Sequence, residues 1–390
     1  MSEAMIPYGR QDISEADIDA VVAVLRSDFL TQGPAVAAFE RTVADHCGIA
    51  HAVAANSATS ALHLACAALG LGPGDRLWTV PNTFVASANC ARYCGATVDF
   101  VDIDPLTRNL SVPALRARLA EAARTGMLPR IVVPVAFAGL PCEMAEIRAL
   151  ADDYGFAILE DASHAIGARY RDRPVGCGEW ADITVFSFHP VKIVTTGEGG
   201  MAVTRDPALA ARMARLRSHG ITRDPAEMDT PPAGPWIYEM QELGWNYRMT
   251  DLQAALGSSQ MRRLDDFVAR RAALAARYDT LLAGSGLTLP PRTADGHSAW
   301  HLYVVGWNEE RSGLSRDAAF MHLRAAGIGV NVHYIPVHLQ PYYRRLGFRP
   351  GQFPAAEAYY ATALSLPLYA TLDEAAQDRV IATLRGMVDR

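Results

Sequence analysis

Short apolar runs alternate along the first half of the chain with stretches in which apolar residues recur at helical spacing. Short runs rich in Val and Ile predict buried strands, and the longer periodic stretches predict amphipathic helices. The predicted strands are 51–55, 76–80, 97–101, 131–135, 156–160 and 183–187. The predicted helices include 13–25, 35–47, 58–69, 87–93 and 143–154. This alternation predicts an α/β fold, with a largely parallel sheet covered on both faces and ligands at the carboxyl ends of its strands.

The second half of the chain has a different pattern. A polar, proline-rich passage at 229–235 predicts a loop. It is followed by a long helical pattern over 250–282, and then by a strand at 300–307, a helix near 318–326 and a final helix after Leu372. This order predicts a large domain over residues 1–249 and a smaller C-terminal α+β domain over residues 250–390, joined by the long helix.

Residues 51–74 contain no charged side chain and would be long enough to cross a membrane. Polar residues such as Asn56 and His63 interrupt the passage, and Gly72-Pro73-Gly74 ends it. We therefore interpret it as a buried strand, a turn and a buried helix. Residues 1–12 are charged and lack the apolar region of a signal peptide, so we expect no export.

Composition narrows the classes of function. Of the 390 residues, 36 are basic and 42 acidic, so the basic excess typical of nucleic-acid-binding proteins is missing and small ligands are favoured. The apolar, Gly and Pro contents are ordinary, which excludes collagen and disordered chains. The six cysteines form no Cys-x-x-Cys pair, which indicates reduced thiols in a cytoplasmic protein and neither a zinc site nor redox chemistry.

Lys192 is the first candidate catalytic residue. It follows a predicted strand and stands in a Gly/Thr-rich loop, where a desolvated amine could condense with an aldehyde. The alternative is an ordinary surface lysine, but lysine is rare in this chain and the loop is hardly charged. Ser187, five residues earlier, could present its hydroxyl to a phosphate, or it could simply finish the strand.

Asp161 is the second candidate. It ends the run 156–160 and should emerge at the carboxyl edge of the sheet, where its carboxylate could keep a pyridine nitrogen protonated. The structural alternative is a helix N-cap. His164 could orient Asp161 or contact a ring substituent, or it could be a hydrogen-bonded core histidine.

Two further segments follow predicted strands. Residues 56–60, Asn-Ser-Ala-Thr-Ser, start a helix without charge, and the free N–H groups of such a helix start favour a phosphate. Ser57 could equally be a plain N-cap. Phe84 could stack on a flat ring, although an aromatic residue in such a place is often part of the core.

Six motifs occur in a fixed order along nearly the whole chain. They are Asn56-Ser57-Ala58-Thr59, Glu160-Asp161-Ala162-Ser163-His164-Ala165, Phe186-Ser187-Phe188-His189-Pro190-Val191-Lys192, Gly197-Glu198-Gly199-Gly200, Arg217-Ser218-His219-Gly220 and Gly244-Trp245-Asn246-Tyr247-Arg248. With them the chain resembles the sugar aminotransferases of the DegT/DnrJ/EryC1/StrS family, which use pyridoxal 5'-phosphate (PLP). Within the family, the chain most resembles the UDP-4-amino-4,6-dideoxy-N-acetyl-β-L-altrosamine transaminases of pseudaminic acid biosynthesis. The resemblance lies in Leu30-Thr31-Gln32-Gly33, Asn56-Ser57-Ala58-Thr59-Ser60, Phe188-His189 before the lysine, and Arg217-Ser218-His219-Gly220.

The resemblance implies the type I aminotransferase fold, whose large domain has a mainly parallel seven-stranded sheet between helices. It implies that PLP is attached to Lys192, whose amine also acts as general base and acid. The implied cofactor contacts from the same chain are Ala58, Thr59, Phe84, Asp161, His164, Ser187 and Lys192. The resemblance also implies a homodimer with shared active sites, in which Asn246 contacts the cofactor from the neighbouring subunit. The implied contacts to a nucleotide sugar are Tyr8, Thr31, His333 and Tyr334, while Arg10 and Arg248 are both candidates for its diphosphate. From sequence alone, Asn246 could be a turn residue and residues 332–336 a strand end.

The implied reaction transfers an amino group from glutamate to C4 of a UDP-linked 4-keto-6-deoxy-N-acetylhexosamine. An aminoarabinose transaminase acting on a UDP-4-keto pentose shares the Phe-His-x-x-Lys pattern, but we would expect Lys-Tyr-Asn at 246–248. The related sugar 3-dehydratases carry histidine at the lysine position, so Lys192 argues against them. A non-catalytic PLP-binding regulator of the same fold is disfavoured by the intact pair of Lys192 and Asp161. We expect no metal, nucleic-acid or membrane partner.

Overall fold

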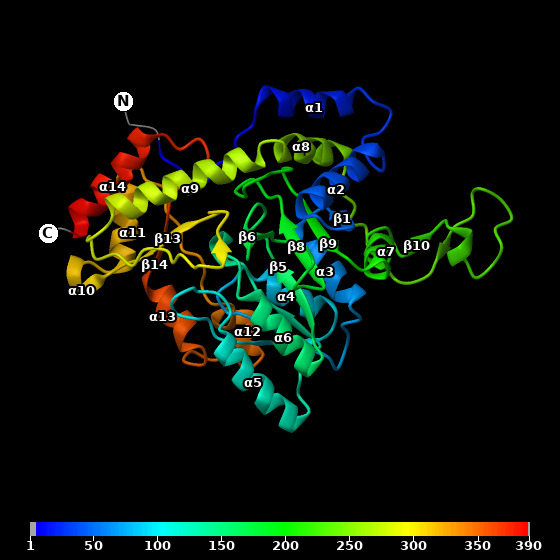
Figure 1. Ribbon diagram of the computed structural model, residues 1–390, viewed down its shortest axis with the longest axis horizontal. Helices are drawn as coiled ribbons and strands as arrows, with labels where there is room; N and C mark the ends of the chain where they lie inside the picture. The colour runs from blue at the N-terminus through cyan, green and yellow to red at the C-terminus, as the bar shows by residue number, and fades with distance from the viewer. Residues whose placement is uncertain (1–4, 389–390) are drawn as a thin grey trace.

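The computed structural model describes residues 5–388, so residues 1–4 of the charged N-terminal passage and residues 389–390 lie outside it. A seven-stranded sheet with the strand order β1-β9-β8-β5-β4-β2-β3 forms its centre (Figure 1). The strands are β1 (His51–Ala55), β2 (Arg76–Thr79), β3 (Thr97–Phe100), β4 (Ile131–Val133), β5 (Ala157–Asp161), β8 (Ile183–Ser187) and β9 (Gly200–Thr204). All neighbours from β8 to β3 are parallel, and only β9 runs antiparallel to both of its neighbours. The predicted α/β fold with a mainly parallel sheet is confirmed.

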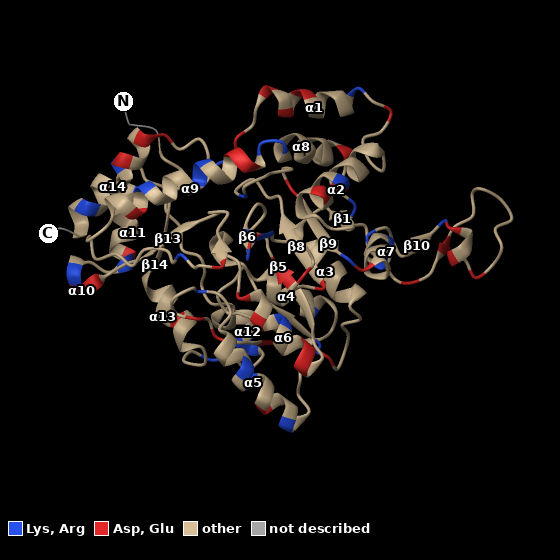
Figure 2. Ribbon diagram, in the orientation of Figure 1, with Lys and Arg blue, Asp and Glu red and all other residues tan. Residues whose placement is uncertain are grey.

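Helices cover this sheet because its strands are apolar on both faces. Every residue of β4, β8 and β9 is buried, as expected for a sheet with no solvated face. The helices of this part are α1 (Glu15–Leu25), α2 (Pro34–Cys47), α3 (Ala58–Ala68), α4 (Ala86–Tyr93), α5 (Val112–Thr125), α6 (Met144–Tyr154) and α7 (Pro207–Leu216). Charged residues lie mostly on the surrounding helices and loops rather than on the central strands (Figure 2).

The six predicted strands are all present, with ends that differ by at most two residues. The pattern did not predict β9, which follows directly after the glycines of the loop and runs against its neighbours. Residues 51–74 form β1 and α3, so the interpretation as a buried strand and helix is confirmed. Within residues 5–388, no helix is long and apolar enough to span a membrane.

The predicted long helix over 250–282 is two helices, α8 (Asp251–Met261) and α9 (Leu264–Leu281). The chain departs from helical geometry at Arg263, where φ is -107° and ψ is 8°. The Arg263 guanidinium reaches back to Asp12 at 3.0 Å and to Asp17 of α1 at 2.6 Å. The break therefore coincides with the point where α8 is tied to the N-terminal segment.

The C-terminal part has its own hydrophobic cluster around a two-stranded antiparallel sheet. Its elements are β13 (Tyr303–Gly306), β14 (Ala363–Leu366), α10 (Glu309–Ser312), α11 (Arg316–Ala325), α12 (Pro341–Arg345), α13 (Pro354–Thr362) and α14 (Glu374–Val388). The predicted strand, helix and final helix are thus present. The domain division between residues 249 and 250 stays a prediction.

Two small sheets complete the fold. One is a three-stranded sheet of β6 (Arg169–Tyr170), β7 (Arg173–Pro174) and β12 (Gly296–His297). The other pairs β10 (Ile221–Thr222) with β11 (Glu239–Met240) at the base of an arm, residues 221–243, which projects from the body of the molecule (Figure 1). The predicted loop at 229–235 lies in this arm and contains no helix or strand.

Candidate active site

A cavity of about 620 Å³ opens at the carboxyl ends of β5 and β8. Segments far apart in the sequence line it: the start of α3, the loop after β2, the loop after β8 and residues 331–334 of the C-terminal part. Ten of the twelve predicted site residues lie there, namely Tyr8, Ala58, Thr59, Phe84, Asp161, His164, Ser187, Lys192, His333 and Tyr334. The fold therefore brings most of the predicted site together at the expected edge of the sheet.

The start of α3 presents backbone donors to the cavity. The Ser57 side chain caps the helix by accepting a hydrogen bond from the Ser60 N–H at 3.1 Å, while no described residue accepts from the N–H groups of Ala58 and Thr59. A Cβ placed on Gly200 would lie 2.5 Å from the Ala58 nitrogen, so only glycine lets β9 approach this turn so closely. Free N–H groups at a helix start form a site for a phosphate.

Asp161 is buried at the end of β5 and is held from both sides. Ser87 of α4 donates its hydroxyl to Oδ2 at 2.6 Å, and Ser163 donates its hydroxyl at 2.5 Å and its N–H at 3.1 Å to Oδ1. These hydrogen bonds fix the orientation of the carboxylate. His164 makes none of these hydrogen bonds, and its role toward Asp161 or a ring substituent stays a prediction.

Lys192 is the only lysine of the sequence, since the other 35 of the 36 basic residues are arginines. Its side chain is half-buried and lines the cavity. Burial lowers the pKa of its amine to about 8, and the negative charge of Asp161 opposes part of this shift. Near neutral pH the amine can therefore both take up and release a proton.

Uncharged aromatic and imidazole groups surround the amine. His164 accepts a hydrogen bond from the Ala138 N–H at Nδ1 (3.3 Å), so its Nε2 carries the proton toward the Tyr334 hydroxyl at 3.2 Å. Burial lowers the pKa of His164 well below its ordinary value and lowers that of His333 to about 3, with the charge of Lys192 contributing to both. Lys192 is therefore the only one of these groups that carries a positive charge near neutral pH.

Phe84 and Tyr8 stand at the edge of the cavity. The Phe84 side chain is 59% exposed, with its ring centroid 6.3 Å from that of Tyr334, so it is not a core residue. The Tyr8 ring lies 5.7 Å from that of His333. Both rings are free to contact a bound molecule.

Two predicted residues lie outside this cavity. Thr31 pairs through its backbone with Thr250, and Asn246 pairs with Ser218. Neither arginine that we considered for a diphosphate lines the cavity, and Arg248 borders a separate hollow with Gln32 and Arg217. A single chain thus does not bring these residues to the site.

Sequence reasoning missed several lining or supporting residues: Ser87, Ser163, His301 and Asn331. His301 is buried with its ring centroid 4.3 Å from that of His164, and its Nδ1 has no hydrogen-bond partner in the described part of the chain. Asn331 lies 3.4 Å from Nε2 of His333. Ser163 stands within a recognised motif and could have been found there, whereas nothing in the local pattern marked the other three.

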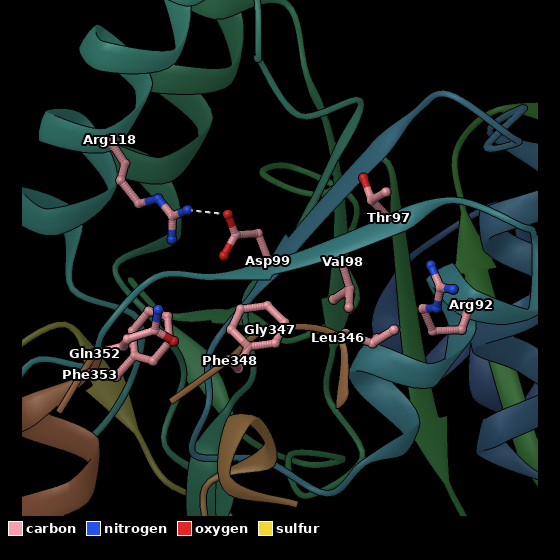
Figure 3. A pocket seen from close by; sticks show the side chains of 10 residues that line it. All are labelled: Arg92, Thr97, Val98, Asp99, Arg118, Leu346, Gly347, Phe348, Gln352 and Phe353. Atoms are coloured by element: carbon pink, nitrogen blue, oxygen red, sulfur yellow. Dashed lines mark hydrogen bonds and ion pairs between the residues drawn. The ribbon is translucent and has the colours of Figure 1, made fainter. Parts of the chain in front are cut away.

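A second, larger concavity of about 710 Å³ borders the edge strand β3 (Figure 3). Its charged groups are already paired: Arg118 forms an ion pair with Asp99, and Arg92 donates to the Ala96 carbonyl at 2.7 Å. No lysine, histidine or cysteine lines it. The chemistry expected of this chain therefore belongs to the smaller cavity.

The residues of the smaller cavity fit PLP. They supply free helix N–H groups and Ser187 for a phosphate, an oriented carboxylate for a ring nitrogen, an exposed aromatic ring for stacking and a single amine for an aldehyde. Within residues 5–388, no group of three or more His, Cys, Asp or Glu side chains could hold a metal ion.

Comparisons with known proteins agree with this chemistry. Residues 11–385 match the model of the DegT/DnrJ/EryC1/StrS aminotransferase family. The spore coat polysaccharide biosynthesis protein SpsC of Bacillus subtilis is 42% identical over 386 residues, which cover 98% of this chain and 97% of SpsC.

Two solved structures share the whole fold. PseC of Helicobacter pylori, an aminotransferase involved in pseudaminic acid biosynthesis, is 29% identical with a TM-score of 0.89 over 99% of both chains. Spr1654 of Streptococcus pneumoniae, in its PMP-form, is 32% identical with a TM-score of 0.88 over 98% of this chain and 99% of its own, and it is also known in a PLP-form. This chain therefore belongs to the DegT/DnrJ/EryC1/StrS family and is a PLP-dependent sugar aminotransferase.

Proposed function

We propose that the chain transfers an amino group from glutamate to C4 of a UDP-linked 4-keto-6-deoxy-N-acetylhexosamine, as in pseudaminic acid biosynthesis. The observation that carries the proposal is that the sole lysine of the chain lines one cavity with Asp161 and the free start of α3. The choice of sugar is supported by the likeness to PseC and by Asn246-Tyr247-Arg248, where an aminoarabinose transaminase would be expected to carry Lys-Tyr-Asn.

Each cofactor residue receives a role from its chemistry. Lys192 would hold PLP through its aldehyde, and Asp161, oriented by Ser87 and Ser163, would pair with the ring nitrogen. The N–H groups of Ala58 and Thr59, together with the Ser187 hydroxyl, hold the phosphate. Phe84 stacks on the ring, and His164 stands close to a ring substituent.

The protein's contribution to the reaction is the movement of one proton. When bound, PLP supplies the electron sink that stabilises negative charge at the substrate carbon. When it is free, the Lys192 amine would take the proton from that carbon and later return it, which its pKa of about 8 permits near neutral pH. The neutral rings of His164 and His333 keep competing positive charge away from the amine.

The sugar half of the site involves a second subunit in our proposal. Tyr8, His333 and Tyr334 contact the sugar from the same chain as Lys192. Thr31 and Asn246, which lie outside this cavity, belong to the site of the partner in a homodimer. The projecting arm supports this assembly, because residues 5–388 leave its apolar residues Trp236 (71% exposed) and Leu243 (78% exposed) uncovered.

The substrate proposal is tested with purified protein. We expect a visible absorbance band that glutamate bleaches and that is absent in Lys192→Ala. A panel of 4-keto UDP-sugars, with product configuration determined by NMR, should then yield a 4-amino hexosamine product. Amination of a UDP-4-keto pentose alone would move the assignment to the aminoarabinose reaction, and an unchanged sugar beside a normal cofactor spectrum would favour a non-catalytic regulator.

Shared sites are tested by mixing two inactive variants, Lys192→Ala and Asn246→Ala. Random mixing of equal amounts makes half of the dimers heterodimers. If Asn246 acts across the interface, each heterodimer has one intact site out of two, so about a quarter of wild-type activity should return. If Asn246 acts within its own chain, mixing restores nothing, which would contradict the proposed arrangement.

A further inference from the structure

His301 is a buried histidine that lines the cavity and has no role in the proposed reaction. The residue is 4% exposed, and its ring centroid lies 4.3 Å from that of His164. Nδ1 is enclosed and has no hydrogen-bond partner within residues 5–388. Nε2 also has no partner in this range, but it is not enclosed, so it faces the open space that the ring lines. A buried polar group without a partner calls for an explanation.

The free nitrogen of His301 is a hydrogen-bond donor. A neutral imidazole carries one proton, and placing it on Nδ1 would leave an N–H group buried without an acceptor. The proton therefore belongs on Nε2, where a molecule bound in the cavity can accept it. Burial lowers the pKa of His301 well below its ordinary value, and the neighbouring His164 and Lys192 contribute, so the ring is neutral near pH 7.

The other two imidazoles beside Lys192 have no such donor left. His164 accepts a backbone N–H at Nδ1 and donates from Nε2 to the Tyr334 hydroxyl. His333 is engaged at both nitrogens, with Nδ1 2.7 Å from the Ser365 hydroxyl and Nε2 3.4 Å from an amide nitrogen. The Tyr334 hydroxyl accepts from His164 and keeps its own proton, so it is a competing donor that the experiment has to include.

The backbone at His301 is held in one conformation. Trp300, the residue before it, has a positive φ of 53°, which costs energy for a residue other than glycine. Arg271 is itself 2% exposed, and its Nη1 donates to the carbonyls of Trp300 at 3.2 Å and of His301 at 3.3 Å. Strain that a buried group maintains is typical of functional positions. Because these contacts involve only the backbone of His301, a change of its side chain leaves them in place.

The position of His301 along the sheet edge matches one substituent of the PLP ring. The strand order β1-β9-β8-β5-β4 puts the start of α3 after β1, Asp161 at the end of β5 and the loop after β4 on the far side. The Leu302 N–H donates to the Ala138 carbonyl of that loop at 3.3 Å, so His301 belongs to the far side. In PLP the phosphate arm and the phenolic oxygen flank the aldehyde carbon on opposite sides. With the phosphate at α3, the oxygen faces His301.

We propose that His301 donates a hydrogen bond from Nε2 to the phenolic oxygen of PLP. The proposal rests on the proposed places of the phosphate, the ring nitrogen and the aldehyde, and it does not depend on the identity of the sugar. A hydrogen bond to an oxygen that carries negative charge is stronger than one between neutral groups. His301 therefore holds the cofactor, and it moves no proton.

The test compares PLP with 3-deoxypyridoxal 5'-phosphate, which keeps the aldehyde and the phosphate but lacks the phenolic oxygen. Each is titrated into the cofactor-free protein without glutamate or sugar, and binding is followed by the quenching of tryptophan fluorescence. His301→Leu should weaken PLP binding roughly 10- to 100-fold and change binding of the analogue less than about twofold, because only PLP loses a hydrogen bond to a charged group. His301→Gln, whose amide can place an N–H near the position of Nε2, should recover part of the loss.

The analogue decides between a specific contact and a general effect on the cavity. Equal weakening of PLP and the analogue in a folded His301→Leu, or no weakening of either, would overturn the proposal. A loss confined to PLP in Tyr334→Phe and absent from His301→Leu would also overturn it, because the tyrosine would then hold the oxygen. Should His301→Leu fail to fold, His301→Asn takes its place in the comparison, because its shorter side chain does not reach the position of Nε2.

Borohydride trapping separates this proposal from the proposed function. An adduct on Lys192 together with equal weakening of both ligands would reject the role of His301 alone. A wild type that binds PLP without an adduct on Lys192 would reject both.

Discussion

The hydroxyl of Ser87 offers a sharp test of how Asp161 is held. Ser87 is fully buried, with Oγ 2.6 Å from Asp161 Oδ2 and 2.8 Å from Thr83 Oγ1. An ionised carboxylate only accepts hydrogen bonds, so Ser87 donates to Asp161 and Thr83 donates to Ser87. Ser87→Ala removes the hydrogen bond to Oδ2, while Oδ1 keeps both bonds from Ser163.

The size of the effect follows from the charge of the acceptor. A hydrogen bond to a charged group contributes about 1.5–3 kcal/mol, and a neutral one contributes about 0.5–1.5 kcal/mol. Ser87→Ala should therefore lower the free energy of unfolding of the cofactor-free protein by about 1.5–3 kcal/mol. The matched control Thr83→Ala, which removes a bond between two hydroxyls, should cost about 0.5–1.5 kcal/mol.

Urea unfolding of four proteins decides whether the charge is the cause. The set is the wild type, Ser87→Ala, Asp161→Ala and the double variant. Because Ser87 acts through the carboxylate, Ser87→Ala should lower the free energy of unfolding less than half as much in the Asp161→Ala background as in the wild type. Equal costs in both backgrounds would refute the reasoning, since the two effects would then be independent.

Three further outcomes are expected. Folding lowers the pKa of Lys192 from 10.5 to about 8, so between pH 8 and pH 10.5 the unfolded chain binds more protons than the folded chain. The free energy of unfolding of the cofactor-free protein should therefore rise with pH over this range. Lys192→Met should flatten that rise in urea unfolding, and an unchanged slope would contradict the assigned pKa. Gly200→Ala should weaken PLP binding at least about tenfold in a spectroscopic titration, because the added Cβ would collide with the start of α3. The control Gly72→Ala should leave binding unchanged, because a Cβ on Gly72 meets nothing within 4 Å. Phe84→Ala should weaken PLP binding with a change in stability below about 0.5 kcal/mol, because the ring is exposed, and a large loss of stability would make it a core residue.

Much of the fold could be predicted because each buried strand is a short apolar run between polar segments. β9 escaped because two glycines precede it and it pairs in the opposite direction, which the alternation of strands and helices does not reveal. The break between α8 and α9 escaped because both helices continue one periodic pattern. It depends on contacts from Arg263 to residues near the N-terminus, a tertiary effect that local periodicity does not contain.

The candidate site was predictable where a residue stands at the end of a strand. Asp161 and Ser187 close β5 and β8, and Lys192 follows in the next loop, so their convergence follows from a parallel sheet. Ser87 lies inside α4 and His301 comes from the C-terminal part, and neither shows its partner in the local sequence. Their role depends on how distant elements pack, which only the structure reveals.

The central claim is that PLP is attached to the amine of residue 192. Borohydride reduction of the purified protein fixes such an attachment, and peptide mapping then locates it. Because Lys192 is the only lysine of the sequence, the account predicts one phosphopyridoxyl adduct on the peptide that contains it. A protein with a normal cofactor spectrum that yields this peptide unmodified after reduction would contradict the account.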